Sequence, residues 1–252
     1  MERDRRAIEV AMARFDAAVA TAIGTIDTAV APFVCAYADA TTVVCGPDYP
    51  YNHVGGVVEA DTLPVILAAY PTQRAALALD LAPILHTTTD TIALHAAGLS
   101  PQPHTVVWIY DIARQPVPRA AANLVWGSEW FHADHIPADP LWTLRMAYEQ
   151  QPGIQFVSLL HPDGIIASTA LHLDDGIAYC HDGWVAPQRR VRGVRGLLLD
   201  AQLRYAAEHD CHTVILVADP QQRSAQIALG RGFLHGWGRE RWTRRAVLKG
   251  AR

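Results

Sequence analysis

The chain has 252 residues, with 21 basic and 25 acidic side chains, a formal net charge of −4 and 50% hydrophobic residues. This length suits one large domain or two small ones, and the apolar content is too high and the charge too low for a disordered protein. No apolar run approaches the roughly 18 residues that a membrane span needs. The sequence therefore predicts a soluble globular protein that does not bind a membrane.

The chain has four cysteines, none in CxxC spacing and all in apolar, strand-like segments: Cys35, Cys45, Cys180 and Cys211. This usage is typical of reduced, buried thiols rather than disulfides. The N-terminal sequence MERDRR is followed by further charged residues, which interrupt any signal-peptide apolar region. We therefore expect a cytoplasmic protein.

The first half of the chain predicts alternating helices and strands. Ile8, Met12, Phe15 and Val19 recur at helical spacing and predict an amphipathic helix over 6–22. The further expected elements are strands 31–37, 41–45 and 52–58, helix 61–70, strand 75–80, helix 88–97 and strand 104–110. Residues 111–123 lack periodicity and hold two prolines, which indicates a linker.

The second half gives clearer patterns. The expected elements are strand 124–131, helix 140–150, strands 154–160, 165–173 and 176–185, helix 193–209, strand 213–218, helix 224–230 and strand 234–242. His161–Gly164 has the composition of a hairpin turn. Both halves share a rhythm of strands, helix, strand, helix and strand, which indicates a degenerate structural duplication.

Charge is unevenly distributed along the chain. Residues 1–120 carry 7 basic and 12 acidic side chains, whereas residues 121–252 carry 14 and 13. The segment from Gln188 to Arg195 holds four arginines and no acid, and it joins a strand to a helix. The start of a helix presents unpaired N–H groups and a positive dipole end, and Gly193 and Gly196 allow close approach of a ligand. Because the whole chain is acidic, we expect a compact phosphate-bearing ligand and no nucleic acid.

Two motifs carry a resemblance to a known family. Val185-Ala-Pro187 followed by Arg190-x-x-Gly193 resembles the acyl-CoA-binding motif of the GNAT acyltransferase superfamily, although Arg195 stands where that family usually has Gly or Ala. The stretch 218–233 is similar to the family's strand, helix and Gly-Phe signature, ending in Gly232-Phe233. Ala228 replaces the tyrosine that usually protonates the departing thiolate.

The resemblance covers residues 124–245 well. Over 30–110 it rests only on element order and on Pro50–Gly56. It implies an α/β (α+β) fold, a GNAT-like mixed, mostly antiparallel sheet flanked by helices, in two GNAT-like lobes. The expected domains are a degenerate N-terminal lobe, 1–115, that does not bind CoA and a catalytic lobe, 124–252, that binds acyl-CoA.

The implied activity is transfer of an acetyl group from acetyl-CoA to an amine of a small molecule by direct attack. The resemblance implies that the following residues bind acetyl-CoA: Trp184, Val185, Arg190, Arg192, Gly193, Val194, Arg195 and Gly196. In the family, the backbone amides at the end of the strand, here at Val185, bind the pantetheine arm and polarise the thioester carbonyl.

Two candidates emerge for catalysis. Strand alternation predicts that Tyr179, His181 and Gly183 share the face of Val185, and a histidine has a pKa suited to a base at neutral pH. His181 is thus the candidate base, unless it is an ordinary hydrogen-bonded strand histidine. Ser224 is the candidate donor to the thiolate, with a helix N-cap as the alternative. The same alternation places Cys180 on the opposite face from Val185, which argues against a thiol nucleophile.

Several alternatives stay open. One set of polar residues could begin an acceptor-binding loop or form an ordinary polar loop: Glu129, His132, Asp134 and His135. The histidine pairs at 132/135 and 209/212 lack further ligands at a recognisable spacing, so no metal site is expected. Non-catalytic acyl-CoA binding and an acyltransferase for antibiotic self-resistance or natural-product tailoring are the alternative functions. A homodimer is also left open.

Overall fold

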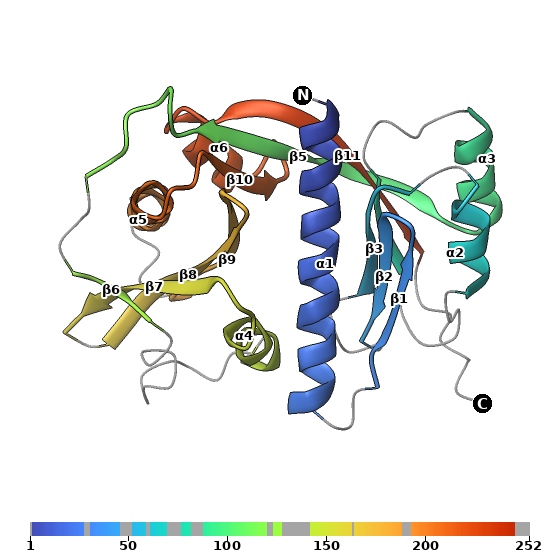
Figure 1. Ribbon diagram of the computed structural model, residues 1–252, viewed down its shortest axis with the longest axis horizontal. Coiled ribbons are helices and arrows are strands. Elements are labelled where there is room, and N and C mark those ends of the chain that lie inside the picture. The colour runs from blue at the N-terminus through green and yellow to red at the C-terminus, as the bar shows by residue number, and fades with distance from the viewer. Residues whose placement is uncertain are drawn as a thin grey trace. The chain divides into compact units, whose positions relative to one another are not determined.

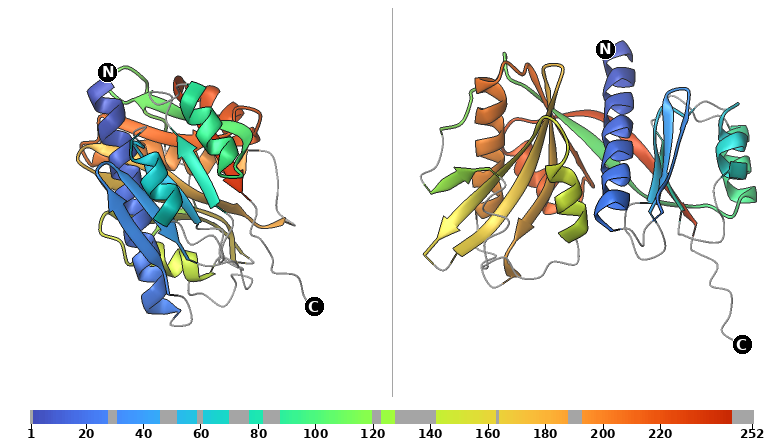
Figure 2. Two further views of the ribbon diagram at one scale, coloured as in Figure 1. Left: turned by 90° about the vertical axis from the view of Figure 1, so that its right-hand side faces the viewer. Right: turned by 60° about the horizontal axis from the view of Figure 1, so that its bottom comes forward.

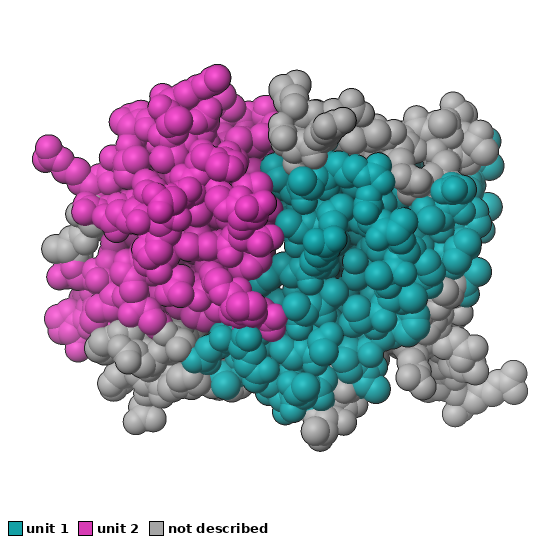
Figure 3. Space-filling view, in the orientation of Figure 1, with its two compact units in different colours: residues 1–105, 143–150, 237–252 teal, residues 106–142, 151–236 magenta. Residues whose placement is uncertain are grey.

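The computed structural model describes residues 2–27, 31–45, 52–58, 61–69, 77–81, 88–119, 123–127, 142–162, 164–187 and 193–244. The chain divides into two compact units, coloured separately in Figure 3. Unit 1 comprises residues 1–105, 143–150 and 237–252, and unit 2 comprises residues 106–142 and 151–236. Strands β5 (Ser100–Asp111) and β11 (Leu234–Arg244) each contribute residues to both units.

The remaining helices and strands follow the order expected from the sequence (Figure 1). They are α1 (Glu2–Ile26), β1 (Phe33–Tyr37), β2 (Ala40–Val44), β3 (Asn52–Gly56), α2 (Leu63–Ala69), β4 (Leu77–Leu81), α3 (Thr88–Ala96), β6 (Leu124–Trp126), α4 (Trp142–Glu149), β7 (Ile154–His161), β8 (Gly164–Asp174), β9 (Ile177–Val185), α5 (Val194–Glu208), β10 (Thr213–Ala218) and α6 (Arg223–Leu229).

Every predicted helix and strand is present among the described residues, with ends that differ by a few residues. Helix α1 extends the predicted helix 6–22 by four residues at each end. Strand β5 begins at Ser100 rather than at residue 104, and its first residues, which include two prolines, are exposed. Residues 128–131 of the predicted strand 124–131 lie outside the described residues.

Unit 1 has a sheet with helices on both faces. Its strands follow the order β1-β2-β3-β4-β11, in which β3 and β4 are parallel and the other neighbours antiparallel. Helix α1 covers one face of β1–β3, and α2 and α3 cover the other (Figures 1 and 2). The predicted apolar stripe of α1 is confirmed, because Ile8, Met12, Phe15 and Val19 are all buried.

A buried charged group ties α1 to β11 inside unit 1. The Glu9 side chain is fully buried, and it accepts a hydrogen bond of 2.8 Å from Nε1 of Trp237. Its other oxygen lies 3.1 Å from a guanidinium nitrogen of Arg239. Burial raises the pKa of Glu9 and outweighs the attraction of Arg239, which lowers it. A charged residue outside the predicted apolar stripe of α1 is therefore part of the core of unit 1.

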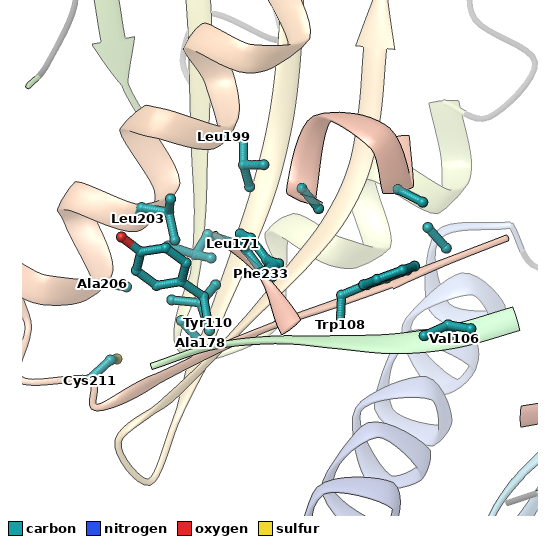
Figure 4. Close-up of a cluster of buried hydrophobic side chains, with 14 residues drawn as sticks. Val106, Trp108, Tyr110, Leu171, Ala178, Leu199, Leu203, Ala206, Cys211 and Phe233 are labelled. Carbon is teal, nitrogen blue, oxygen red and sulfur yellow. The ribbon is translucent and has the colours of Figure 1, made fainter. Parts of the chain in front are cut away.

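Unit 2 is built on strands in the order β5-β10-β9-β8-β7-β6. Strands β9 and β10 are parallel, and the other neighbouring pairs are antiparallel. Helix α5 packs across β7, β8 and β9. Figure 4 shows Leu171, Leu199, Leu203 and Phe233 gathered between α5 and the strands, where all four are buried.

The Gly-Phe signature has a structural role in this core. Gly232 has a φ of +93°, a left-handed conformation that side-chain-bearing residues rarely adopt. It turns the chain so that Phe233 enters the core, where its ring lies 5.2 Å from the ring of Tyr110 (Figure 4).

The fold class is the one expected, a mixed and mostly antiparallel sheet flanked by helices. The domain boundaries 1–115 and 124–252, and the two-lobed arrangement, remain predictions, since the compact units interleave along the chain. Among the described residues, no helix is both long and apolar enough to cross a membrane.

Candidate functional site

The two parallel strands of unit 2 separate along their length. Strands β10 and β9 pair over four residues, from Thr213 opposite Ile177 to Leu216 opposite Cys180. Strand β9 continues to Val185 and β10 to Ala218 without further pairing between them. The backbone groups that face the opening are thus not used to join these two strands.

A cavity of about 240 Å³ lies where the strands part. Three of the predicted site residues line it, from three different elements: His181 of β9, Arg195 of α5 and Ser224 of α6. Its apolar wall comes from β10 and the two helices, and its remaining residues are Thr169, Cys180, Gly183, Leu198, Leu199, Gln202, Leu216, Val217 and Ile227.

A β-bulge in β9 corrects the predicted faces of this strand. Ala170 of β8 pairs with His181, but Ser168 pairs with Trp184, so two residues of β9 lie opposite one residue of β8. The extra residue reverses the alternation beyond it. The prediction that Val185 shares a face with Tyr179, His181 and Gly183 is therefore wrong.

Packing against α5 agrees with this assignment. Val185 contacts the same cluster as Val194 and Leu198 of α5, and Cys180 packs on the cluster that contains Leu199. Cys180 and Val185 consequently lie on one face, contrary to the prediction. Burial raises the pKa of the Cys180 thiol to about 12, so the group is a neutral thiol at physiological pH.

The His181 ring lies on the other face of β9. Its centroid is 6.2 Å from that of His172 and 6.5 Å from that of Tyr179. Burial lowers the pKa of His172 more than Asp174 raises it, which favours the neutral imidazole next to His181. Trp184 follows the bulge with its side chain on this same face, since its partner Ser168 neighbours the partner of His181.

The start of α5 has the form expected of an anion-binding turn. Its N-cap residue, Gly193, has a φ of 102° and ψ of −23°, and no side chain caps the helix. A β-carbon at Gly193 would meet no atom of the described residues within 4 Å, so this side of the turn is open among them. The side chain of Val194 is buried in the core, which leaves only its backbone for a ligand. Arg190 and Arg192 lie outside the described residues.

Gly196 makes room for a side chain of the protein itself. A β-carbon there would overlap the guanidinium of Arg231. That guanidinium donates two hydrogen bonds to the carboxylate of Asp200, at 2.9 and 3.1 Å. The bonds to Asp200 raise the pKa of Arg231 despite its partial burial. A positive charge that the sequence reasoning missed therefore lies against the first turn of α5.

Ser224 does not cap its helix. The N-cap of α6 is Gln222, without a side-chain cap bond, and Ser224 is the second helical residue. Ser224 and Ile227 line the cavity, whereas Ala225 and Ala228 are fully buried in the core. The position of the missing tyrosine, Ala228, thus belongs to the core.

The polar loop residues and the histidine pairs are the two remaining sets of candidates named in the sequence analysis. Glu129, His132, Asp134 and His135 lie outside the described residues. In the part of the chain that the structure describes, no three His, Cys, Asp or Glu side chains gather as a metal site would require.

Sequence reasoning missed the buried polar pair Thr169 and Gln202 on the cavity wall. One signal was available, because Gln202 interrupts an apolar stripe of α5 between Leu198, Leu199 and Leu203.

Comparison with known proteins agrees with this geometry. The model of the "Acetyltransferase (GNAT) family" matches residues 122–233. A GCN5-related N-acetyltransferase from Kribbella flavida is 13% identical with a TM-score of 0.57, and the match covers 95% of this chain and 96% of that one. A GNAT-family protein from Novosphingobium aromaticivorans is 14% identical with a TM-score of 0.57, covering 85% and 92%. One from Sphaerobacter thermophilus is 12% identical with a TM-score of 0.54, covering 82% and 80%. No curated protein sequence matches.

The fold and the cavity define a protein of the mixed α/β class in which a parallel strand pair parts beside a glycine-started helix. At identities this low, the solved structures establish the fold alone. The family match is more specific, because residues 122–233 match the model of the GNAT acetyltransferase family, in the part of the chain where the motifs carry the resemblance.

Proposed function

We propose that this protein transfers the acetyl group of acetyl-CoA to an amine of a small molecule by direct attack. The observation that carries the proposal is the cavity between the parting ends of β9 and β10, which is lined by His181, Arg195 and Ser224. The GNAT family match supports acyl transfer as the class of reaction.

Binding of the acyl donor would use backbone groups at the start of α5 and along the end of β9. The unpaired N–H groups at the start of α5 and its dipole favour an anion such as a pyrophosphate. Open space at Gly193 supports this assignment, and Arg195 adds a positive charge. The freed strand edge of β9 offers backbone groups to the amide-bearing pantetheine arm and to the thioester carbonyl.

The proposed chemistry requires three proton transfers. An alkyl amine is mostly protonated at neutral pH and must lose one proton before it attacks the thioester carbon, and we assign this step to His181. The attacking nitrogen loses a second proton, to solvent, as the amide bond forms and the carbon–sulfur bond breaks. The departing thiolate gains a proton, and we assign this step to Ser224, whose hydroxyl regains a proton from solvent. A covalent enzyme intermediate on Cys180 is not proposed, because its thiol has a pKa of about 12.

Acyl-CoA binding without catalysis is the second candidate. The observation that favours it is the burial of Ala228 in the core, which leaves no tyrosine acid on α6. Under either candidate we propose a cytoplasmic protein, and a small-molecule amine as its partner if it is an enzyme. Use in antibiotic self-resistance or natural-product tailoring concerns the acceptor and stays an alternative, as does a homodimer.

One experiment separates the two candidates. The protein is incubated with acetyl-CoA and a panel of amines or a metabolite mixture, and free thiol release and acetylated products are measured by absorbance and mass spectrometry. An enzyme gives products that depend on both substrates. Binding of acetyl-CoA in calorimetry without any product would favour the non-catalytic candidate, and absence of binding would contradict both.

A further inference from the structure

The bulge of β9 lies at the point where this strand leaves β10. Asp182 and Gly183 are the two residues of β9 that lie opposite Thr169 of β8. The last pair between β9 and β10 is Cys180 with Leu216, two residues before the bulge. A bulge bends its strand and increases the local twist. The direction of the freed end of β9 therefore depends on how this bulge is held.

A buried hydroxyl holds the bulge from β8. Oγ1 of Thr169 donates a hydrogen bond of 2.9 Å to the backbone carbonyl of His181, the residue immediately before the bulge. Thr169 is 6% exposed, so water does not replace this bond readily. The bond joins the unpaired position of β8 to the bulged strand.

A buried amide in turn holds Thr169. Nε2 of Gln202, on α5, donates to Oγ1 of Thr169 at 3.2 Å and to the backbone carbonyl of Ala170 at 2.7 Å. Both hydrogens of this amide are thus used on β8, which fixes the orientation of the side chain. Gln202 is 3% exposed and also lines the cavity. A chain of hydrogen bonds therefore runs from α5 through β8 to the bulge.

We infer that Thr169 and Gln202 are positioning residues, which hold the β9 bulge so that the backbone from Gly183 to Val185 is aligned for the acyl donor. The inference rests on the proposed function for the identity of the ligand. The hydrogen bonds from Gln202 through Thr169 to the bulge can nevertheless be tested without it. Apolar residues would fill the same core without the cost of burying polar groups. Neither side chain contacts the reacting atoms in this scheme.

The protein offers a matched comparison for Thr169. Thr42 of β2 is also buried, at 1% exposure, but its Oγ1 has no hydrogen-bond partner among the described residues. Replacing Thr42 by valine removes an unsatisfied hydroxyl, which is close to neutral for stability or favourable. The same exchange at Thr169 removes a hydrogen bond to the bulge. The two variants share their chemistry and differ in the role of the hydroxyl.

The test compares Thr169→Val, Thr169→Ser and the control Thr42→Val. Calorimetry gives the Kd for CoA, and mass-spectrometric hydrogen exchange gives the protection of peptides from β9. We expect Thr169→Val to raise the Kd about fivefold to tenfold, the factor for one lost hydrogen bond, and to speed exchange in β9. Thr169→Ser keeps the hydroxyl, so its Kd for CoA and its exchange in β9 should be close to those of the native protein. Thr42→Val should leave both quantities unchanged.

Failure of this inference is distinguishable from failure of the proposed function. If the native protein binds CoA and Thr169→Val binds it equally well, the positioning role is overturned while the function stands. If serine, which keeps the hydroxyl, weakens binding as much as valine does, loss of the hydroxyl does not account for the effect, which also overturns it. If the native protein does not bind CoA, the proposed function fails. Hydrogen exchange in β9 alone then tests whether Thr169 holds the bulge. Should Thr169→Val not fold, Gln202→Met is judged by the same two readouts.

Discussion

Gly193 offers a substitution whose two effects can be separated. Its φ of +102° is left-handed, and a β-carbon there would have no atom of the described part of the chain within 4 Å. Any small side chain therefore has room, and the cost of a substitution is backbone strain of about 1–3 kcal/mol. Gly193→Ala and Gly193→Asp both incur this strain. A carboxylate is favourable near a helix start, so we expect the aspartate variant to be at least as stable as the alanine variant.

The two variants should differ strongly in binding CoA. Only aspartate adds a negative charge next to the expected pyrophosphate. Two unit charges about 5 Å apart near a protein surface repel by roughly 3 kcal/mol, which corresponds to about a hundredfold in Kd. We therefore expect Gly193→Asp to bind CoA about a hundredfold more weakly than Gly193→Ala.

Calorimetry with CoA on the native protein and both variants measures this difference, and thermal unfolding measures the strain. The difference between the variants should shrink in about 1 M salt, where the screening length falls to about 3 Å. Equal affinities of the two variants would place the anion elsewhere. Equal and complete loss of binding in both would mean that backbone conformation, not charge, governs the site, and would refute the electrostatic reasoning.

Three further predictions concern the donor, the stoichiometry and the pH dependence. Ser224→Ala should lower turnover about tenfold or more with little change in Tm, because Gln222 rather than Ser224 is the N-cap; normal turnover removes Ser224 from the site. Calorimetry should give one CoA per chain, bound in unit 2, and two would contradict the prediction that residues 1–115 do not bind it. Burial lowers the pKa of His53, but Asp16, 2.8 Å from Nε2, outweighs it, so the pKa lies above its ordinary value of 6.5. His53 should then stabilise the fold fully below pH 6.5 and progressively less as the pH rises through the folded pKa. His53→Gln should remove this slope from the free energy of unfolding in denaturant titrations, and an unchanged slope would disprove the assignment.

The order of helices and strands could be predicted because the spacing of apolar residues and the residue types in the turns indicate the same elements along most of the chain. The turn at His161–Gly164 is an example, since Gly164 has the φ of +113° that favours glycine there. Strand β10 occupies the predicted residues 213–218 without change. The predicted ends of helices and strands were wrong where the sequence has no apolar pattern. The charged first residues of α1 carry no stripe, and the prolines at the start of β5 disfavour a strand except at an exposed position.

The site was less predictable, because its geometry depends on features that leave no periodic signal. One bulged residue in β9 reverses the face of Val185, and nothing in the alternation marks it. The charge of Arg231 beside Gly196 arises from a pairing with Asp200, 31 residues earlier in the chain. Motif spacing found residues on the cavity wall, such as Arg195 and Ser224, because a motif records local chain order rather than long-range contacts.

The replacement of the family's tyrosine has a structural consequence beyond a missing proton donor. Helix α6 turns Ser224 and Ile227 to the cavity and Ala225 and Ala228 to the core. Ala228 is fully buried, and its carbonyl accepts hydrogen bonds from the N–H groups of residues 231 and 233. A larger side chain at this position would overpack the core in this structure. If the protein transfers an acetyl group as proposed, the proton for the thiolate comes from the cavity-facing side of α6, where Ser224 carries a hydroxyl, or from solvent that enters the cavity.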